Sequence, residues 1–268
     1  MSRSIPKPKN FFSARKPVSA RIIHGDCLSS MDKLIKENKK FDMIFADPPY
    51  FLSNGGITCQ SGKMVKVDKG SWDKSQGQKL NHEFNIEWIR RCRELLENHG
   101  TLWVSGTMHI IYSIGFAMQE LEMKILNNVT WQKPNPPPNL AGRYFTHSTE
   151  TLLWARKNEK SKHIYNYSLM KEENEGKQMK DVWTFTAPKK SEKTEGKHPT
   201  QKPIGLLDRI IRASTEEGAT ILDPFLGSGT TSVAAVLSGR NSIGIEQEEK
   251  FCELSKKRIQ LAQKQLKN

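Results

Sequence analysis

The residues Asp47-Pro48-Pro49-Tyr50 combine a carboxylate, two prolines and an aromatic ring directly after the apolar run 41–46. That run is typical of a buried strand in a parallel sheet. Because proline lacks an N–H group and fixes φ, the chain is predicted to leave the strand in a rigid, extended turn. Open α/β sheets bind ligands at the carboxyl ends of their strands. We therefore expect Asp47 to hydrogen-bond an amino group on a planar ring and Tyr50 to stack on that ring.

A second motif lies far downstream, where the apolar run 219–222 is followed by Asp223 and the turn Phe225-Leu226-Gly227-Ser228-Gly229. Glycines allow close approach of a ligand to the backbone, and the helix start that follows favours a negative group. Glu246 comes after the next apolar run, near the spacing at which an acidic side chain binds ribose hydroxyls. Because a full G-x-G-x-x-G is absent, a nucleoside that carries a carboxylate fits this motif better than a dinucleotide.

The composition favours a polyanionic partner. Lysine and arginine outnumber aspartate and glutamate by 42 to 29, for a net charge of +13, and neutralising phosphates releases counterions. A generally basic surface is the alternative explanation. The mean hydropathy is -0.64 and no apolar run reaches about 18 residues, so no membrane segment is expected. The 4 cysteines contain no C-x-x-C pair, which predicts reduced thiols in a cytoplasmic protein and no metal site.

Hydrophobic periodicity predicts an α/β chain. The expected strands are 21–24, 41–46, 101–105, 125–131, 149–155, 219–222 and 241–245, and the expected helices are 28–36, 85–98, 110–121, 203–215, 229–239 and 248–266. Gly100 is expected to end the helix 85–98, and Trp88, Trp103 and Phe116 are expected in the core. Residues 53–80 lack periodicity and are predicted to form a long mobile loop.

Together the motifs resemble one enzyme family. Asp47-Pro48-Pro49-Tyr50 and Phe225-x-Gly227-x-Gly229 resemble motifs IV and I of the S-adenosylmethionine-dependent DNA amino-methyltransferases, and their order resembles the permuted β class. The stretches 131–139 and Arg143-Tyr144-Phe145 resemble the middle section of the N6-adenine members, and His198-Pro199-Thr200-Gln201-Lys202-Pro203 resembles motif X. Three further stretches, 46–56, 144–150 and 177–183, resemble the DpnA-type second methyltransferases of DpnII-like GATC restriction–modification systems.

This resemblance implies a Rossmann-like methyltransferase fold: a mostly parallel, seven-stranded-type sheet with helices on both faces, in circularly permuted order. Residues 1–20 are then a flexible basic arm rather than a signal peptide. Residues 21–268 form a single domain, with a catalytic half (21–156), an insert or target-recognition region (157–197, with the loop 53–80) and a cofactor-binding half (198–268).

The resemblance also implies the site residues. Asp47, Pro48, Pro49 and Tyr50 are catalytic. The residues expected to bind S-adenosylmethionine, and the product S-adenosylhomocysteine, are Asp26, Cys27, Asp47, His198, Thr200, Lys202, Asp223, Phe225, Gly227, Ser228, Gly229, Thr230, Thr231, Glu246 and Gln247. The residues expected to contact DNA are Lys133, Asn135, Asn139 and Arg143.

Several of these residues have an alternative role. Asp26 would serve equally as a helix N-cap. Lys202 would pair with the cofactor carboxylate or lie solvated on the surface. Thr230 and Thr231 are expected to cap the following helix and to reach the same carboxylate. The four DNA-contacting residues would otherwise only build their loop.

The expected function is methylation of adenine N6, with GATC as the site, a restriction endonuclease as functional partner and double-stranded DNA as substrate. Single-stranded DNA and a homodimer are further expectations from the resemblance. One alternative is methylation of cytosine N4 or of an amino group in RNA or protein; cytosine-N4 members more often carry serine at the position of Asp47. The other alternative, a non-catalytic nucleic-acid-binding module, predicts damage in one motif, and both motifs are intact.

Overall fold

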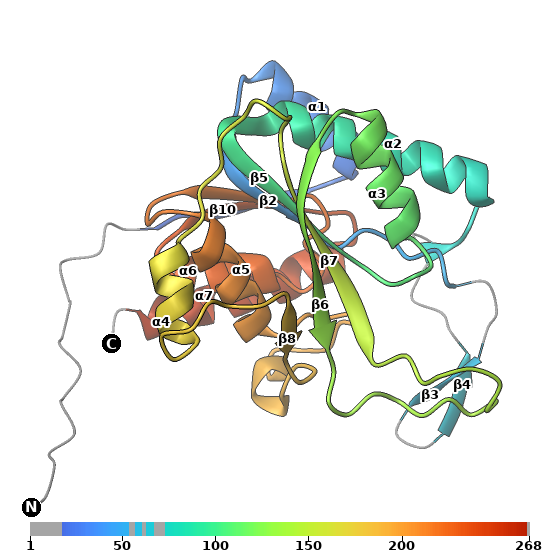
Figure 1. Cartoon of the computed structure of the whole chain (residues 1–268). Helices are drawn as coiled ribbons and strands as arrows, with labels where there is room; N and C mark the ends of the chain where they lie inside the picture. Colours follow the sequence, from blue (N-terminus) through green and yellow to red (C-terminus); the bar gives the residue numbers. More distant parts are fainter. Residues whose placement is uncertain (1–17, 54–56, 61–62, 67–72, 267–268) are drawn as a thin grey trace, which may run out of the picture.

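The protein is built around one large sheet (Figure 1). The structure is a computed structural model that describes residues 18–53, 57–60, 63–66 and 73–266. In chain order, the strands of the large sheet are β1 (Ala20–His24), β2 (Phe41–Ala46), β5 (Leu96–Gly106), β6 (Lys124–Gln132), β7 (Thr149–Arg156), β8 (Val182–Thr184), β9 (Thr220–Asp223) and β10 (Asn241–Glu246). Two more strands, β3 (Ile57–Gln60) and β4 (Lys63–Lys66), pair with each other in a separate antiparallel sheet.

The strands of the large sheet lie in the order β1-β10-β9-β2-β5-β7-β6-β8. Along this spatial order, β1, β10, β9, β2 and β5 pair parallel with one another, whereas β7 pairs antiparallel with both of its neighbours, β5 and β6. The pairing of β2 with β9 joins two segments that lie far apart in the sequence: Met43 lies opposite Ile221, and Ile44 lies opposite Leu222. The two sequence motifs therefore follow neighbouring strands and leave the sheet at the same edge.

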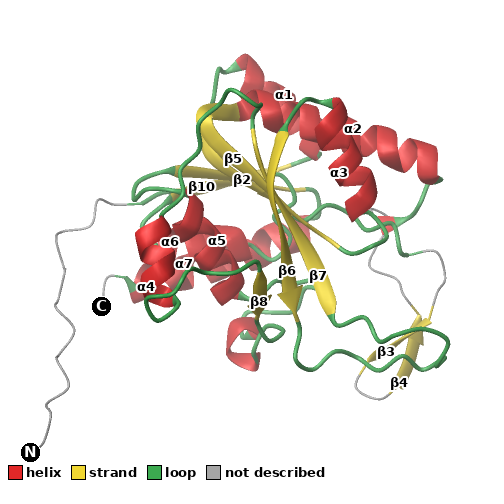
Figure 2. Ribbon diagram, in the orientation of Figure 1, coloured by secondary structure: helices red, strands yellow, loops and turns green. Residues whose placement is uncertain are grey.

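Helices cover both faces of the sheet (Figure 2). They are α1 (Cys27–Lys36), α2 (Gln78–Leu95), α3 (Ile111–Glu120), α4 (Tyr167–Glu173), α5 (Ile204–Ser214), α6 (Thr230–Leu237) and α7 (Glu249–Gln265), with a 3-10 helix at Lys190–Lys193. Buried apolar residues of α1, α2 and α3 form one core, and those of α5 and α6 form another on the opposite face. Strand β2 sends Ile44 into the first core and Phe45 into the second, so its apolar run is buried on both sides.

This architecture confirms the predicted α/β methyltransferase-like fold, and the large sheet has one strand more than expected. The extra strand, β8, pairs parallel with β6 and comes from the region 157–197. Part of this region therefore belongs to the sheet, and the rest packs outside it. From the same region, Glu173 of α4 forms an ion pair with Arg212 of α5. The sequence showed no periodicity there, because a three-residue strand and a seven-residue helix are too short to produce one.

Three local predictions were wrong. The helix predicted at 85–98 begins at Gln78, so the segment 53–80 contains the start of α2 as well as β3 and β4. Gly100 does not end that helix but lies within β5, where a Cβ atom would come within 2.8 Å of the Phe41 carbonyl oxygen. Phe116 is 55% exposed, whereas Trp88 and Trp103 are buried in the core as predicted.

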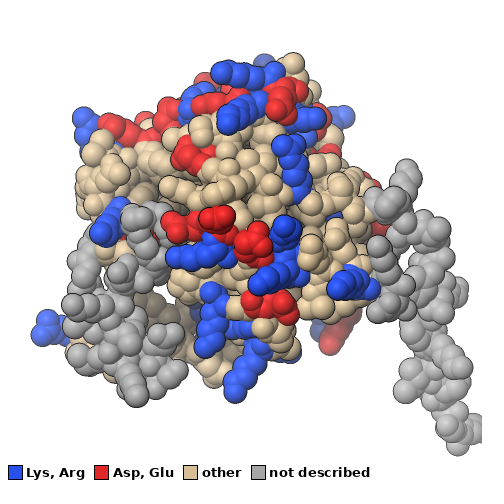
Figure 3. All heavy atoms as spheres, turned by 180° about the vertical axis from the view of Figure 1, so that it is seen from behind, with Lys and Arg blue, Asp and Glu red and all other residues tan. Residues whose placement is uncertain are grey.

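Charged side chains of both signs share the surface. The face seen in Figure 3 carries lysine and arginine beside aspartate and glutamate, and it is not uniformly basic. No helix among the described residues is long and apolar enough to cross a membrane.

Candidate active site

One cavity brings the two sequence motifs together. It has a volume of about 300 Å³ and lies where β2 and β9 end, with Asp47 on one side and Asp223 on the other. Every residue predicted to be catalytic or to bind the cofactor lines this cavity except Gly229, which stands directly beside lining residues. Residues that lie far apart in the sequence therefore line one cavity.

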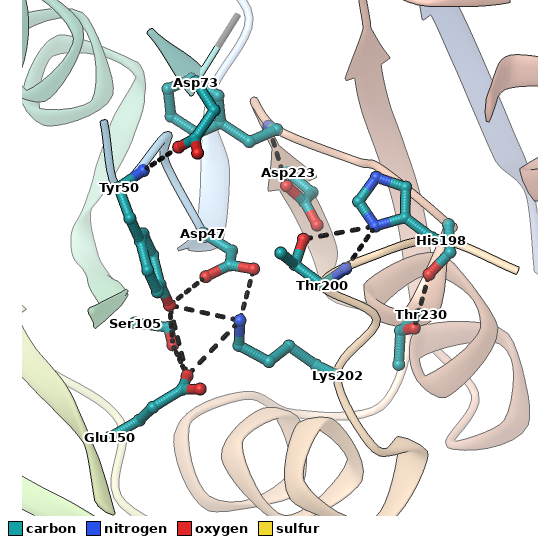
Figure 4. Close-up of polar contacts among 12 residues, drawn as sticks. Asp47, Tyr50, Asp73, Ser105, Glu150, His198, Thr200, Lys202, Asp223 and Thr230 are labelled. Atoms are coloured by element: carbon teal, nitrogen blue, oxygen red, sulfur yellow. Dashed lines mark hydrogen bonds and ion pairs between the residues drawn. The ribbon is translucent and has the colours of Figure 1, made fainter. Parts of the chain in front are cut away.

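Asp47 is held by two side chains at the floor of this cavity (Figure 4). The Tyr50 hydroxyl donates to Asp47 Oδ1 at 2.8 Å, and Lys202 Nζ donates to Asp47 Oδ2 at 2.5 Å. A carboxylate offers about four lone-pair positions, so Asp47 keeps the capacity to accept further hydrogen bonds from an amino group. Lys202 is 7% exposed, which rules out its alternative role as a solvated surface lysine.

Glu150, the second residue of β7, completes a charged cluster with Asp47, Lys133 and Lys202. Lys133 Nζ binds Glu150 Oε1, and Lys202 Nζ lies 3.5 Å from Glu150 Oε2. The Tyr50 hydroxyl also lies 3.2 Å from that oxygen. Two carboxylates and two ammonium groups therefore balance one another inside the protein, as buried charges must.

Burial and pairing compete in setting the pKa values of this cluster. Burial raises the pKa of Asp47 above its ordinary value, and the Lys202 charge opposes that rise. Burial alone would also raise the pKa of Glu150, but Lys202 and Lys133 outweigh it and lower the value to about 2. Burial would lower the pKa of Lys202, yet the charges of Asp47 and Glu150 raise it. The pKa of Glu150 is therefore lowered and that of Asp47 raised, so Asp47 is the carboxylate that takes up a proton first as pH falls.

The glycine-rich turn after β9 approaches neighbouring backbone closely. Gly229 has φ of +77°, and a Cβ atom there would lie 2.9 Å from Ser255 Cβ, so no larger residue fits without strain. Gly229 itself is the N-cap of α6, and no side chain caps that helix. The expected capping by Thr230 and Thr231 is therefore wrong; Thr230 Oγ1 instead accepts a hydrogen bond from Arg258 at 3.1 Å.

Two buried carboxylates support this turn. Glu246 Oε2 accepts from the Gly227 N–H at 2.7 Å, and Asp223 accepts from the Phe225 N–H at 2.9 Å. Burial raises the pKa of both acids, that of Asp223 to about 7. Each carboxylate retains lone pairs toward the cavity, so Glu246 is free to accept from hydroxyl groups in addition to holding Gly227.

Asp26 and His198 lie at the rim of the cavity with roles inside the fold. Asp26 Oδ1 accepts from the Ser29 N–H at 2.9 Å, which makes it the N-cap of α1 while it also lines the cavity. The His198 ring packs against Phe251 at a centroid distance of 4.2 Å and covers Gly227. Thr200 donates its N–H to His198 Nδ1 at 3.2 Å, so the segment that resembles motif X folds over the glycine-rich turn.

The cavity fits a nucleoside that carries an amino acid. Its lining offers backbone at the start of α6 for a carboxylate, Asp223 for a cationic group and Glu246 for paired hydroxyls. Phe225, Phe251 and the proline pair add apolar surface for a ring. These features match the chemistry of S-adenosylmethionine group by group.

The residues predicted to contact DNA separate into different environments. Lys133 belongs to the charged cluster, and its ammonium also lies 4.6 Å from the Trp131 ring centre. Asn139 shapes its own loop, because its amide donates to the Tyr144 carbonyl at 2.6 Å and its oxygen accepts from Ala141. Asn135 and Arg143 are exposed, so they remain the two available for contact with a partner.

Three residues of the site had no assigned role from the sequence: Glu150, Ser105 and Asp73. Ser105 Oγ lies 3.3 Å from both the Tyr50 hydroxyl and Glu150 Oε2. The signal for Glu150 was a charge at the start of an otherwise apolar strand. Asp73 lies in the Gly-, Ser- and Lys-rich segment, where composition carried no such signal.

Comparison with known proteins identifies the family of this chain. The family model described as "DNA methylase" matches residues 41–257. The chain is 56% identical to the type II methyltransferase M2.DpnII of Streptococcus pneumoniae over 94% of this chain and 92% of that protein. It is 52% identical to the type II methyltransferase M2.MboI of Moraxella bovis, over 92% of this chain and 90% of that protein.

Solved structures give the same answer at the level of the fold. The M1.HpyAVI complex with S-adenosylmethionine superposes with a TM-score of 0.70 at 29% identity, over 90% of this chain and 98% of that one. The cytosine-N4-specific PvuII DNA methyltransferase superposes with a TM-score of 0.69 at 17% identity, over 91% of this chain and 87% of that one, a likeness of fold alone. The chain therefore belongs to the DNA methylase family, and S-adenosylmethionine is its methyl donor.

Proposed function

We propose that this DNA methyltransferase acts on the N6 amino group of adenine in GATC and thereby protects DNA from a cognate restriction endonuclease in the cytoplasm. The observation that carries the proposal is the position of Asp47. Its carboxylate lies at the end of β2, beside the glycine-rich turn after β9, in one cavity. An acceptor for an amino group thus faces the place where the methyl donor fits. Aspartate rather than serine at this position favours adenine over cytosine.

The chain's own residues suit three tasks in this reaction. Bound S-adenosylmethionine supplies an electrophilic methyl group. Asp47 and the Pro48 carbonyl would accept hydrogen bonds from the adenine amino group, which orients its lone pair and stabilises the positive charge that develops. The Tyr50 ring would stack on the base once it has left the duplex.

The acceptor site GATC and the pairing with an endonuclease rest on the resemblance to the second methyltransferases of DpnII-like systems and on the type II names of the relatives. The same resemblance makes single-stranded DNA a second substrate, besides duplex DNA, and a homodimer the expected assembly. Asn135 and Arg143 are the proposed contacts to DNA, since asparagine can read adenine and arginine can read guanine or bind phosphate.

A labelled S-adenosylmethionine assay tests the proposal. The protein is incubated with oligonucleotides that differ in one base of GATC, as duplexes and as single strands, and the methylated base is identified. N6-methyladenine only in GATC is the expected product, whereas N4-methylcytosine or no product in any DNA would refute it. An Asp47→Ala variant should lose methyl transfer yet still bind S-adenosylmethionine in equilibrium titration.

A further inference from the structure

The segment after Asp47 is held in place by a side chain from outside it. Asp73 lies between β4 and α2 and is fully buried, with 0% exposure. Its Oδ1 accepts from the Tyr50 N–H at 2.9 Å, and its Oδ2 accepts from the Leu52 N–H at 3.3 Å. Because Pro48 and Pro49 have no N–H, the Tyr50 N–H is the first backbone donor after Asp47, and Asp73 takes it.

The backbone between these two donors has an unusual conformation. Phe51 has φ of +55°, a left-handed conformation that costs a residue with a Cβ atom about 1–2 kcal/mol. This turn brings the N–H groups of Tyr50 and Leu52 toward one carboxylate, in the way that successive N–H groups cradle an anion. The acceptor here is the Asp73 side chain, and the hydrogen bonds it accepts offset the strain at Phe51.

Asp73 makes further contacts to the same segment. Ser53 Oγ donates to Asp73 Oδ2 at 2.7 Å, and the Ser53 N–H donates to the Asp73 carbonyl at 3.1 Å. Asp73 therefore hydrogen-bonds to residues 50, 52 and 53, the first of which lines the cavity together with Asp47. The Phe51 ring, which packs edge-on against Phe84 of α2 at 6.2 Å, adds a second link to the same side.

We propose that Asp73 is a positioning residue for methyl transfer: it holds the strained turn at Phe51 so that Tyr50 stays aimed at Asp47. This inference rests on the proposed function of Asp47 and Tyr50. Asp73 lines the same cavity, and its hydrogen bond to Tyr50 goes to the backbone N–H. It acts through the backbone of Tyr50, whose hydroxyl lies 2.8 Å from Asp47. Without the hydrogen bonds to Asp73, the Tyr50 side chain is no longer held in the position in which it stacks on the base.

The first test is a graded set of variants. Asp73→Ala removes both acceptors and should slow single-turnover methyl transfer about 100-fold, the size of effect that a displacement of about 1 Å produces. Asp73→Asn keeps one carbonyl oxygen and should slow it about tenfold. Ser53→Ala keeps both backbone hydrogen bonds and should slow it less than Asp73→Asn does. The dissociation constant for S-adenosylmethionine should change by less than about threefold in each variant.

The second test separates positioning from general stability through residue 51. Phe51→Ala and Phe51→Gly both lose the ring, but only alanine keeps the cost of positive φ. With Asp73 present, the two variants should transfer methyl groups at similar rates. In the Asp73→Ala background, the glycine variant should be about fivefold or more faster than the alanine variant, because glycine still adopts the turn unaided. An equal ratio in both backgrounds would overturn the proposal.

Hydrogen exchange provides a measurement that does not need activity. Exchange of the Tyr50 and Leu52 amides should accelerate in Asp73→Ala, while amides in β9 and α6 remain protected. If wild-type protein methylates no DNA but exchange of these amides is still faster in Asp73→Ala, the proposed function is refuted, whereas the role of Asp73 in holding this segment is supported. If wild-type protein is active and Asp73→Ala retains full single-turnover activity, the positioning role is refuted. A parallel loss of thermal stability, cofactor affinity and rate would assign Asp73 a structural role only and would likewise refute it.

Discussion

Removal of the positive charge of Lys202 is the sharpest test of the charged cluster. Lys202 Nζ lies 2.5 Å from Asp47 Oδ2 and 3.5 Å from Glu150 Oε2, and the residue is 7% exposed. In Lys202→Met the side chain keeps a similar length without its charge. Lys133 then remains as the only cation of the cluster opposite two buried carboxylates, so one negative charge is uncompensated.

The structure allows the size of this effect to be worked out. Removing one partner of a buried ion pair costs about 3–5 kcal/mol. A domain of this size loses about 2–4 °C in Tm for each kcal/mol, so Tm should fall by about 6–20 °C near pH 8. The same loss does not arise for an exposed pair, where the charges are already solvated.

The pH dependence of the loss has a definite sign. Burial already raises the pKa of Asp47, and Lys202 is the charge that opposes the rise, so the pKa of Asp47 should be higher still in Lys202→Met. An acid whose pKa is raised by folding holds a proton that the unfolded chain releases. Its unfavourable contribution therefore grows as pH rises above the ordinary carboxyl pKa and disappears below it. The difference in Tm should be largest at alkaline pH and should shrink as pH approaches about 4.

The rate of methyl transfer should depend on whether Asp47 carries this proton. A protonated Asp47 accepts hydrogen bonds from the amino group poorly, so methyl transfer should be slower in Lys202→Met and should recover in part as pH rises. Thermal unfolding and single-turnover rates across the pH range measure both effects. Lys202→Arg should preserve most of both, and Lys256→Met, on an exposed lysine of α7, should change neither.

Two results would refute this reasoning. If Lys202→Met unfolds within about 2 °C of the wild-type protein at every pH, the cluster is not a tight buried pair. If instead the variant binds S-adenosylmethionine far more weakly but transfers methyl groups normally at saturation, Lys202 serves the cofactor carboxylate, as the resemblance implied, and not Asp47.

Three further predictions concern single residues. Tyr50→Phe keeps the ring but loses the hydroxyl on Asp47, so it should retain methyl transfer within about tenfold, whereas Tyr50→Ala should lose about 5–150-fold through lost base stacking; equal losses in a steady-state assay would contradict this. Because burial raises the pKa of Asp223 to about 7 from 3.8, the contribution of Asp223 to the free energy of unfolding should fall by about 4 kcal/mol as pH rises from 4 to 8. Denaturant titrations should show that decline flattened in Asp223→Asn. Gly229→Ala places Cβ against Ser255 at positive φ, and it should lower the unfolding free energy by about 1–3 kcal/mol and weaken cofactor binding; unchanged calorimetry would contradict the close approach.

Much of the fold follows from local pattern. The runs 41–46 and 219–222 are each followed by an aspartate and a proline, so the strands they form and their position at the edge of the site were predictable. Residues 157–197 and 53–80 were not, because β8 and α4 are stabilised by contacts with the sheet and with α5 rather than by their own sequence. That β5 begins at Leu96, before Gly100, likewise depends on how closely the backbone of β2 approaches Gly100.

The residues that follow β2 and β9 indicate the chemistry locally, because the prolines after Asp47 restrict the turn and the glycines after Asp223 permit close approach of a ligand. Which groups contact Asp47 depends instead on how distant segments pack. Lys202 reaches both Asp47 and Glu150 only because β7 and the segment before α5 converge on the end of β2. Asp73 reaches Tyr50 only because the chain returns from β4 to α2. Pairing between distant charges depends on packing, which periodicity and spacing do not encode.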